Sequence, residues 1–209
     1  MKAKSRKLSR AEQKAFRPIQ SLDAAFEEFV ANGYTATRVE DIAERIGVTK
    51  GTIYVYFPTK EDVFTAMINH ISVPLEELLA DAAQLRGGCA ERLQALLLLV
   101  YERVSDNRQV RELIRFVISD GSRFPHVIKA HHDDLIEPLF NITQSLLDEG
   151  IATGEFRDTP AALAPVIVAP LIARMVDTLI FEGTRNLDLP SYIKAHLDLV
   201  LSALAVPRP

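Results

Sequence analysis

Residues 37–57, TRVEDIAERIGVTKGTIYVYF, decide the fold. Apolar residues recur at intervals of three and four before Gly47, which is the spacing of one helix face. Gly47 stands where a helix commonly ends in a positive φ, and Thr49 follows as an N-cap for a second short helix. Two helices at about 38–45 and 49–56, joined by a tight turn, predict a helix-turn-helix.

The outward side of helix 49–56 is rich in hydrogen-bonding groups once Ile53 and Phe57 are turned inward. In a helix-turn-helix the second helix enters the major groove of DNA, where Lys50 can donate to guanine O6 and N7. Residues at helix starts suit phosphate contacts. The candidate DNA-binding residues are Thr37, Arg38, Thr49, Lys50, Gly51, Thr52, Tyr54, Val55, Tyr56 and Lys60.

The charge distribution is compatible with a nucleic-acid partner but does not require one. The 209 residues carry a net charge of −4, but residues 1–17 hold seven Lys or Arg against the single acid Glu12. Residues 1–70 hold 11 basic and 9 acidic residues, and the remainder holds 13 and 19. The basic end can bind phosphates or form a solvated arm. Helix pairs with glycine turns also occur in all-α proteins that bind no DNA.

The first helix covers about residues 16–30 and ends at Asn32-Gly33. Its start has two alternatives: Ser9 with Glu12 as a capping box, or Pro18 in the first turn. In the first case Pro18 lies inside the helix and should kink it.

Further capping signals place the other helices. Thr37 and Glu40 form a capping box for helix 38–45, and Thr59 opens a helix to about residue 71. Thr159-Pro160 begins another helix that reaches about residue 181. The remaining helical patterns cover 89–104, 108–119, 126–150 and 191–205, and no alternating strand pattern has a useful length. We therefore predict an all-α fold of about nine helices, with domains at 1–70 and 71–209.

The longest nearly apolar run, residues 161–173, is shorter than the ~20 residues that span a bilayer, and Arg174 and Asp177 follow it. We expect a buried helix and no membrane segment. Arg174 and Asp177 can pair with each other, bridge a subunit interface or orient a ligand. Pro165 and Pro170 should bend this helix. Close approach of two subunits would use Ala161, Ala162, Ala164, Ala169 and Ala173, with Leu187, Leu197, Leu201 and Leu204 of the last helix.

Other candidate sites give weaker signals. His126, His131 and His132 precede Asp133 and Asp134, but their spacing does not bring ligands together, so we expect no metal. No nucleophile–base constellation or phosphate loop is present, so we expect neither an enzyme nor a cofactor. The single cysteine, Cys89, fits a reducing cytoplasm. The candidate lining of an apolar ligand pocket is Tyr101, Phe116, Phe124, Phe140 and Met175, which can equally be ordinary core.

Residues 29–67, FVANGYTATRVEDIAERIGVTKGTIYVYFPTKEDVFTAM, closely resemble the TetR/AcrR family of transcriptional regulators. The resemblance covers about residues 12–70. The matching motifs are Gly33-Tyr34, Thr37, Ile42-Ala43, Gly47-Val48-Thr49, the run from Gly51 to Phe57, and Thr59-Lys60-Glu61. Pro18 departs from the family pattern, in which a helix former is more usual at that position.

The resemblance implies an all-α homodimer with a three-helix DNA-binding domain. The larger domain would bind a small-molecule effector and dimerise through its last two helices. Family DNA contacts map onto Arg38, Lys50, Thr52, Tyr54, Val55, Tyr56 and Lys60. We expect a repressor that leaves a palindromic double-stranded DNA operator when an apolar or amphipathic ligand binds. The alternative is a ligand-binding or protein-interaction module whose helix-turn-helix does not function, and the acidic remainder of the chain favours it.

Overall fold

The computed structural model describes residues 10–104, 107–181 and 188–206, with side chains from residue 15 onward. Helices make up its secondary structure there, apart from an isolated bridge between Phe156 and Ala205, so the predicted all-α class is confirmed. The chain forms two compact units, Met1–Ile71 and Ser72–Pro209. Each unit is described by itself.

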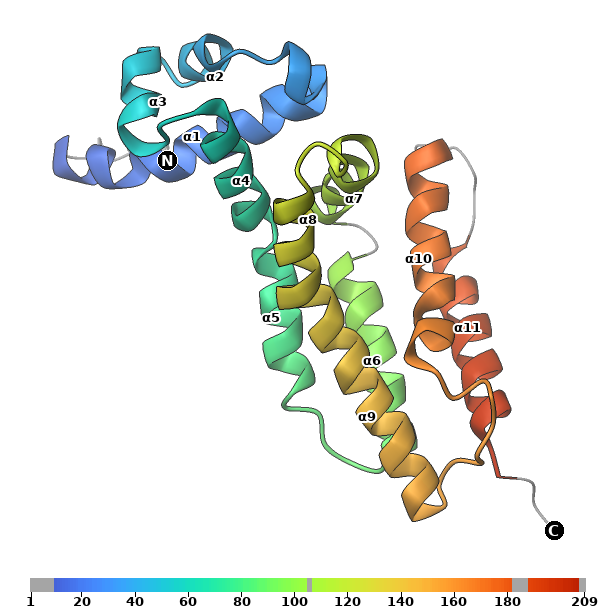
Figure 1. Ribbon diagram of the computed structural model, residues 1–209. Coiled ribbons are helices and arrows are strands. Elements are labelled where there is room, and N and C mark those ends of the chain that lie inside the picture. The colour runs from blue at the N-terminus through green and yellow to red at the C-terminus, as the bar shows by residue number, and fades with distance from the viewer. Residues whose placement is uncertain (1–9, 105–106, 182–187, 207–209) are drawn as a thin grey trace, which may run out of the picture. The chain divides into compact units, whose positions relative to one another are not determined.

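The first unit contains four helices: α1 (Arg10–Ala36), α2 (Val39–Arg45), α3 (Lys50–Tyr56) and α4 (Lys60–Ile71). Helix α1 packs against all three others, and α2 and α3 contact each other (Figure 1). The core between them is aromatic. Phe29 of α1 lies edge-to-face with Phe64 of α4 at 5.3 Å between ring centroids, and Tyr34 stacks on Phe29 at 5.7 Å.

Pro18 lies inside α1, so of the two predicted starts the one before Pro18 is correct; Ser9 itself lies outside the described residues. The residue of α1 with non-helical dihedrals is Gly33 (φ 72°, ψ 167°), where we predicted the end of the helix, rather than Pro18. Only glycine adopts this backbone region without strain. Gly33 therefore redirects the chain from α1 towards α2.

The capping box of α2 lies one residue later than predicted. Arg38 is the N-cap, and its backbone N–H donates to Asp41 Oδ2 at 3.0 Å. Thr37 turns inward and donates its hydroxyl hydrogen towards the carbonyl oxygens of Glu28 and Gly33, at 3.0 and 2.8 Å. The predicted box of Thr37 with Glu40 was wrong, because the turn after Gly33 takes up the threonine hydroxyl.

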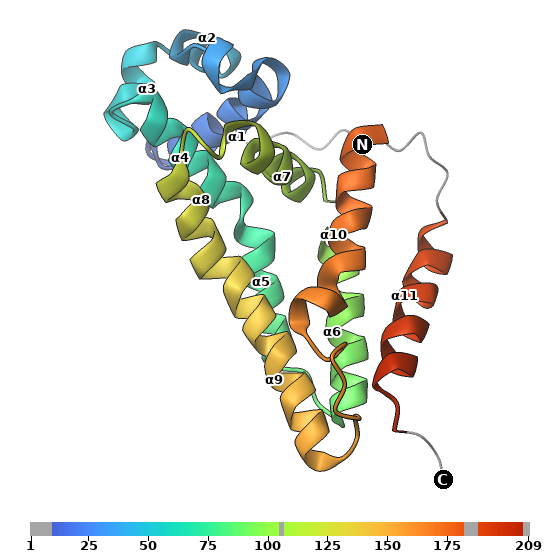
Figure 2. The same cartoon turned by 45° about the vertical axis from the view of Figure 1, so that its right-hand side comes forward.

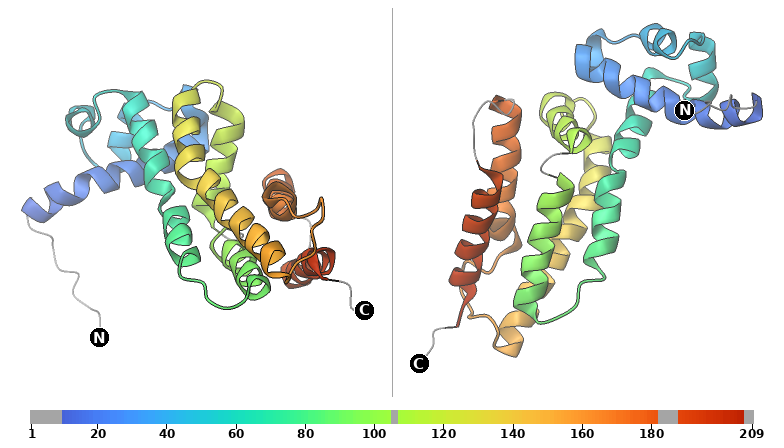
Figure 3. Two further views of the ribbon diagram at one scale, coloured as in Figure 1. Left: turned by 60° about the horizontal axis from the view of Figure 1, so that its bottom comes forward. Right: turned by 180° about the vertical axis from the view of Figure 1, so that it is seen from behind.

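The second unit begins with α5 (Val73–Ala82), α6 (Cys89–Val104) and α7 (Arg108–Asp120). Then α8 (Pro125–His131) runs through a π-helical turn, η1 (His132–Ile136), into α9 (Glu137–Thr153), as Figure 2 shows. The unit ends with α10 (Ala164–Phe181) and α11 (Leu189–Leu204). Helices α5, α6 and α9 pack together, α10 contacts α9 and α7, and α11 contacts α6 (Figure 3).

Two elements of the second unit differ from the prediction. Helix α5 was not predicted. Pro74 lies in its first turn, where the missing N–H of proline costs no hydrogen bond. Helix α10 starts at Ala164 rather than Thr159. The backbone N–H of Ala164 donates to Gln144 Oε1 at 2.9 Å, so a side chain of α9 caps α10. Pro165 consequently lies in its first turn.

Helix α10 was predicted to be buried, and this is correct for one side only. Its buried residues are Ala164, Ile167, Val168 and Leu171, and Ile167 packs in a cluster with residues of α6 and α11. Elsewhere the helix exposes Val166, Ile172, Ile180 and Phe181. Among the residues that the structure describes, one helix, α10, is long and apolar enough to cross a membrane by the criteria of length and composition. Arg174 and Asp177 interrupt it, with Arg174 Nη1 3.7 Å from Asp177 Oδ2.

Candidate nucleic-acid interface and ligand cavity

Helix α3 is held on α2 by a tight glycine turn. Gly47 has φ 67°, and its N–H donates to the carbonyl of Glu44 at 3.0 Å, while the N–H of Val48 reaches back to Ala43 at 2.9 Å. This hydrogen-bond pair terminates α2 as a Schellman motif. Ile42, Ala43 and Ile53 are fully buried beneath the turn. The turn thereby holds the two short helices in a fixed orientation to each other. The side of α3 away from the buried residues faces outward.

The outward side of α3 carries the predicted contact residues. Val55 is 76% exposed and Tyr54 is 40% exposed. Thr49, Lys50 and Gly51 are also exposed, whereas Thr52 and Tyr56 are half-buried. Thr49 is the N-cap of α3, and its hydroxyl lies 3.2 Å from that of Thr52. The first turn of α3 therefore presents an ammonium group, two hydroxyls and a residue without a side chain.

The ammonium group of Lys50 is paired within the chain. Its Nζ lies 2.7 Å from Glu40 Oε1 on α2, and both side chains are more than half exposed. The Glu40 carboxylate raises the pKa of Lys50, and Lys50 lowers the pKa of Glu40. Because an exposed pair of this kind is weak, a phosphate or a base can replace Glu40 as the partner of Lys50.

The other predicted cations stand at the ends of helices. Arg38, before α2, pairs with Asp41 at 3.0 Å, and the carboxylate raises the pKa of the guanidinium. Lys60 opens α4; its ammonium lies 4.5 Å from the centroid of the Tyr34 ring. Thr37 is 1% exposed, so the predicted phosphate contact of its side chain is not available. The predicted basic arm falls mainly on residues 1–9, outside the described residues.

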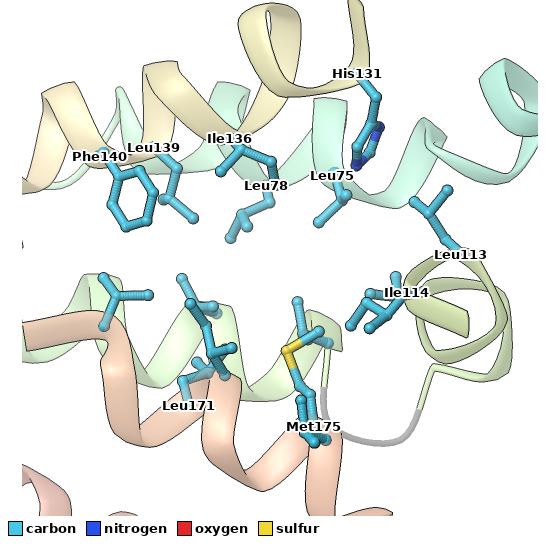
Figure 4. A pocket seen from close by; sticks show the side chains of 16 residues that line it. Leu75, Leu78, Leu113, Ile114, His131, Ile136, Leu139, Phe140, Leu171 and Met175 are labelled. Carbon is cyan, nitrogen blue, oxygen red and sulfur yellow. The ribbon is translucent and has the colours of Figure 1, made fainter. Parts of the chain in front are cut away.

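The second unit contains an apolar cavity of about 220 Å³. Six of its helices and the π-turn line it, and Figure 4 shows the side chains that point into it. Of the sixteen lining residues, all except His131 are apolar. They are Leu75, Leu78, Val100, Val104, Val110, Leu113, Ile114, His131, Ile136, Leu139, Phe140, Val168, Leu171, Ile172, Met175 and Val176.

His131 lies next to the π-turn, and its Nδ1 is 3.3 Å from the hydroxyl of buried Ser72. Burial lowers the pKa of His131, since its charged form loses solvation. The imidazole is therefore neutral at pH 7 and adds a hydrogen-bonding group, but no charge, to the cavity. Single π-turns within α-helices occur frequently at functional sites.

Two of the five predicted pocket residues, Phe140 and Met175, line the cavity. The other three do not. Phe116 and Phe124 are core residues at 3% exposure. Tyr101 is buried, and its hydroxyl donates to His196 Nδ1 at 2.8 Å, while His196 Nε2 donates to the carbonyl of Ile167 at 2.9 Å. The aliphatic lining was missed because buried valines and leucines look the same in sequence whether they face a cavity or the core.

The histidine-rich segment shows one possible metal-ligating group among the described residues: His132, Asp133 and Glu137, with ligand atoms within 4.8 Å of one another. All three are exposed, and Asp133 pairs with Lys129. His126 and His131 are not part of it. This arrangement is an ion-paired helix surface.

Exposed apolar residues stand on both α10 and α11, and we call this set the flank: Val166, Ala169, Ile172, Ala173, Ile180, Ala195 and Leu199. Of the predicted interface residues, Ala162, Ala164, Leu197 and Leu204 are instead buried within the unit. Ala161 and Leu201 are half-buried. Leu187 lies outside the described residues. Ala162, Leu197 and Leu204 belong to the buried cluster that contains Cys89 and Phe156, so they do not contribute to the flank.

The sequence and fold match known proteins. The family model for bacterial regulatory proteins of the tetR family matches residues 22–67. The fatty acid metabolism regulator protein of Bacillus subtilis is 23% identical over 92% of this chain and 97% of its own length. A TetR/AcrR regulator of Thermobifida fusca is 31% identical, with a TM-score of 0.62, over 88% of this chain and 96% of that one.

The structure of FadR of Bacillus subtilis in complex with stearoyl-CoA has the same fold, with a TM-score of 0.65 and 22% identity over 89% of this chain and 98% of that one. The resemblance predicted from residues 29–67 is therefore confirmed over nearly the whole chain, and the proteins matched are regulators rather than enzymes. This chain belongs to the TetR/AcrR family of DNA-binding transcriptional regulators.

Proposed function

We propose that the protein is a homodimeric cytoplasmic repressor that binds a palindromic operator through α3 and leaves it when an acyl-chain ligand enters the cavity. The observation that carries this proposal is the presence, in one chain, of a solvent-facing recognition helix and an apolar cavity. The first feature supports DNA reading and the second supports control by a small molecule.

We assign each DNA-contact residue a role from its position on its helix. Lys50 and Gly51 open α3, and the N-terminal residues of a recognition helix contact base edges. Arg38 and Lys60 lie at the starts of α2 and α4, where cations and backbone N–H groups suit phosphates. We assign sequence reading to Lys50 and Thr52, and backbone positioning to Arg38, Tyr56 and Lys60.

The flank supports the homodimer. A set of exposed apolar residues on two helices is costly in water unless a partner covers it. A two-fold axis through the flank would place α10 and α11 against their copies as a four-helix interface, with the alanines allowing close approach. Two recognition helices about 34–36 Å apart would then read adjacent major grooves.

The size and lining of the cavity support the ligand class. An apolar cavity of roughly 150 Å³ holds a benzene ring of six carbons, so about 220 Å³ holds about nine non-hydrogen atoms by the same proportion. An extended hydrocarbon chain fits a lining without charge. The likeness to a fatty acid metabolism regulator and to a stearoyl-CoA-bound structure favours an acyl chain over other apolar ligands.

The release mechanism rests on the chain connection at Ser72. Leu75 and Leu78 of α5 line the cavity, and α5 follows α4 after this single residue. A ligand that shifts α5 would therefore shift α4 and change the separation of the two recognition helices. A differential affinity of about 1–3 kcal/mol between the two states lowers operator occupancy by about 5–150-fold.

The experiment is a binding titration on DNA from the protein's own promoter region, with and without decanoyl-CoA. The proposal expects a specific complex at modest salt that the ligand dissociates. Val168→Phe, which fills the cavity, should keep the complex and lose the response, whereas Val73→Phe, an exposed change outside the lining, should keep both. Absence of a complex with any genomic fragment would support the alternative of a ligand-binding module instead.

A further inference from the structure

A small recess adjoins the cavity between α6, α7 and α10. Its volume is about 10 Å³, and its lining is Val104, Arg111, Arg174, Met175 and Thr178. Val104 and Met175 also line the main cavity, so the two spaces share a wall. A volume of about 10–15 Å³ is the room that one water-sized atom needs. The apolar cavity thus has two arginine side chains at its border.

Arg174 is held in this recess with hydrogen-bonding capacity unused. Its Nη1 donates to Thr178 Oγ1 and lies 3.7 Å from Asp177 Oδ2, beyond hydrogen-bond distance. Its Nε is buried and has no hydrogen-bond partner among the residues that the structure describes. A buried N–H without an acceptor is costly, and such groups are seldom left unexplained in a native protein.

Arg111 brings a second cation from α7. Its Nε lies 4.0 Å from Glu112 Oε1, and Arg115 approaches Glu112 Oε2 at 3.3 Å, so two guanidiniums share one carboxylate. With Arg174 and Asp177 included, the cluster holds three cations and two carboxylates. Counted by themselves, these five side chains carry one more positive than negative charge.

His131 is the other polar group of the cavity, and it cannot supply that charge, because burial lowers its pKa. Figure 4 shows Met175, which borders the recess, on the wall opposite His131, and Phe140 at the other end of the cavity. A ligand can therefore extend its hydrocarbon chain towards Phe140 with a charged end at the recess.

We infer that Arg111 and Arg174 bind the anionic head group of the effector, whose hydrocarbon chain fills the cavity. The inference rests on the proposed function, since it concerns the ligand of the same cavity. A carboxylate or phosphate oxygen would accept from Arg174 Nε and from the Arg111 guanidinium, and such charge-assisted bonds are strong and directional. A free fatty acid and an acyl-CoA both carry this chemistry.

The test compares three ligands with the same ten-carbon chain: decanoate, decanoyl-CoA and 1-decanol. Affinities are measured on the full chain by displacement of an environment-sensitive fluorophore. For the unmodified protein we expect at least one of the two anions to bind about 10- to 100-fold more tightly than the alcohol, the range that a hydrogen bond to a charged group supplies. Binding of decanoate alone would identify the carboxylate, and binding of decanoyl-CoA alone the phosphates.

Variants separate the head-group role from packing. Arg174→Met and Arg111→Met should each reduce the preference for the anion and leave the affinity for 1-decanol unchanged. Arg174→Lys should retain part of the preference, because it keeps the charge. Arg115→Met is the matched control: it removes a charge from the same cluster, but Arg115 does not line the recess, so the preference should remain.

The outcomes also separate this inference from the proposed function. Equal affinity for the alcohol and both anions would overturn the head-group site while leaving an apolar effector in place. Failure of all three ligands to bind would contradict the acyl-chain ligand itself. Loss of 1-decanol binding in Arg174→Met together with a lower unfolding temperature would assign Arg174 a structural role and overturn the inference.

Discussion

Lys50 Nζ, at the start of the recognition helix, lies 2.7 Å from Glu40 Oε1 of the preceding helix. The pair joins α2 to α3 on the side that we propose to face DNA, so the carboxylate competes with DNA for the same ammonium group. If Lys50 contacts DNA as we propose, binding exchanges the Glu40 contact for a DNA contact, and the cost of the exchange can be measured.

Glu40→Gln should strengthen operator binding, because it removes the competing carboxylate and one negative charge. Exposed ion pairs are weak, so we expect a gain of about two- to five-fold in affinity at modest salt. Fluorescence anisotropy with a labelled operator measures it. Glu44→Gln is the matched control, since it removes the same charge from α2 without a contact to Lys50. An equal gain in both variants would show that only overall charge matters.

Lys50→Ala and Lys60→Ala should weaken DNA binding in different ways. Lys60 is assigned to the phosphate backbone, so its loss should weaken all sequences alike and flatten the slope of log K against log salt by about one. Lys50 is assigned to a base edge, so its loss should reduce the preference for the operator over a scrambled site. Identical effects on slope and preference would refute this division of roles.

Acid should destabilise the second unit through His131. Its pKa is lowered in the folded state by burial, so the unfolded chain binds the proton more tightly than the folded one. The stability that neutral His131 contributes is complete above the unfolded pKa of about 6.5 and is lost as pH falls from there towards the lower folded value. His131→Gln should show a smaller fall in Tm between pH 7 and pH 5 than the unmodified protein. His126→Gln, an exposed change, should behave like the unmodified protein, and a matching reduction there would exclude His131 as the source.

Leu199→Glu should dissociate the proposed homodimer. Leu199 is 65% exposed and forms the α11 part of the flank with Ala195, and a buried, unpaired carboxylate is strongly unfavourable in an interface. Light scattering after size-exclusion chromatography should report a monomer with weaker operator binding. Leu98→Glu places the same charge on an exposed leucine of α6, outside the flank, and should remain dimeric. A dimeric Leu199→Glu protein would place the interface elsewhere.

Local signals made much of the fold predictable. Apolar spacing and the glycine at position 47 predicted α2, its turn and α3 to within one residue, because short-range hydrogen bonds decide these elements. The reciprocal hydrogen bonds of Thr59 and Asp62 at the start of α4 follow from the same local chemistry. The apolar spacing also predicted the bounds of long helices such as α6.

Features that depend on distant residues were not predictable. The start of α10 is set by Gln144, twenty residues earlier in the chain, which a local pattern does not contain. Thr37 was expected at the DNA, but the carbonyls of Glu28 and Gly33 hold it inside. The cavity lining comes from seven separated elements, and only their packing distinguishes it from core. The sequence left three roles open for Arg174: a pair with Asp177, a contact at a subunit interface, or a contact with a ligand. Its position at the recess favours the contact with a ligand.

Operator binding that a ligand releases is tested most directly by DNase I footprinting of the protein on its own promoter region, with and without decanoyl-CoA. We expect protection of one two-fold symmetric site, with half-sites about 10 base pairs apart, and loss of protection when the ligand is added. Absence of a protected site at any protein concentration, or a footprint that the Lys50→Ala variant reproduces unchanged, would contradict the proposed function.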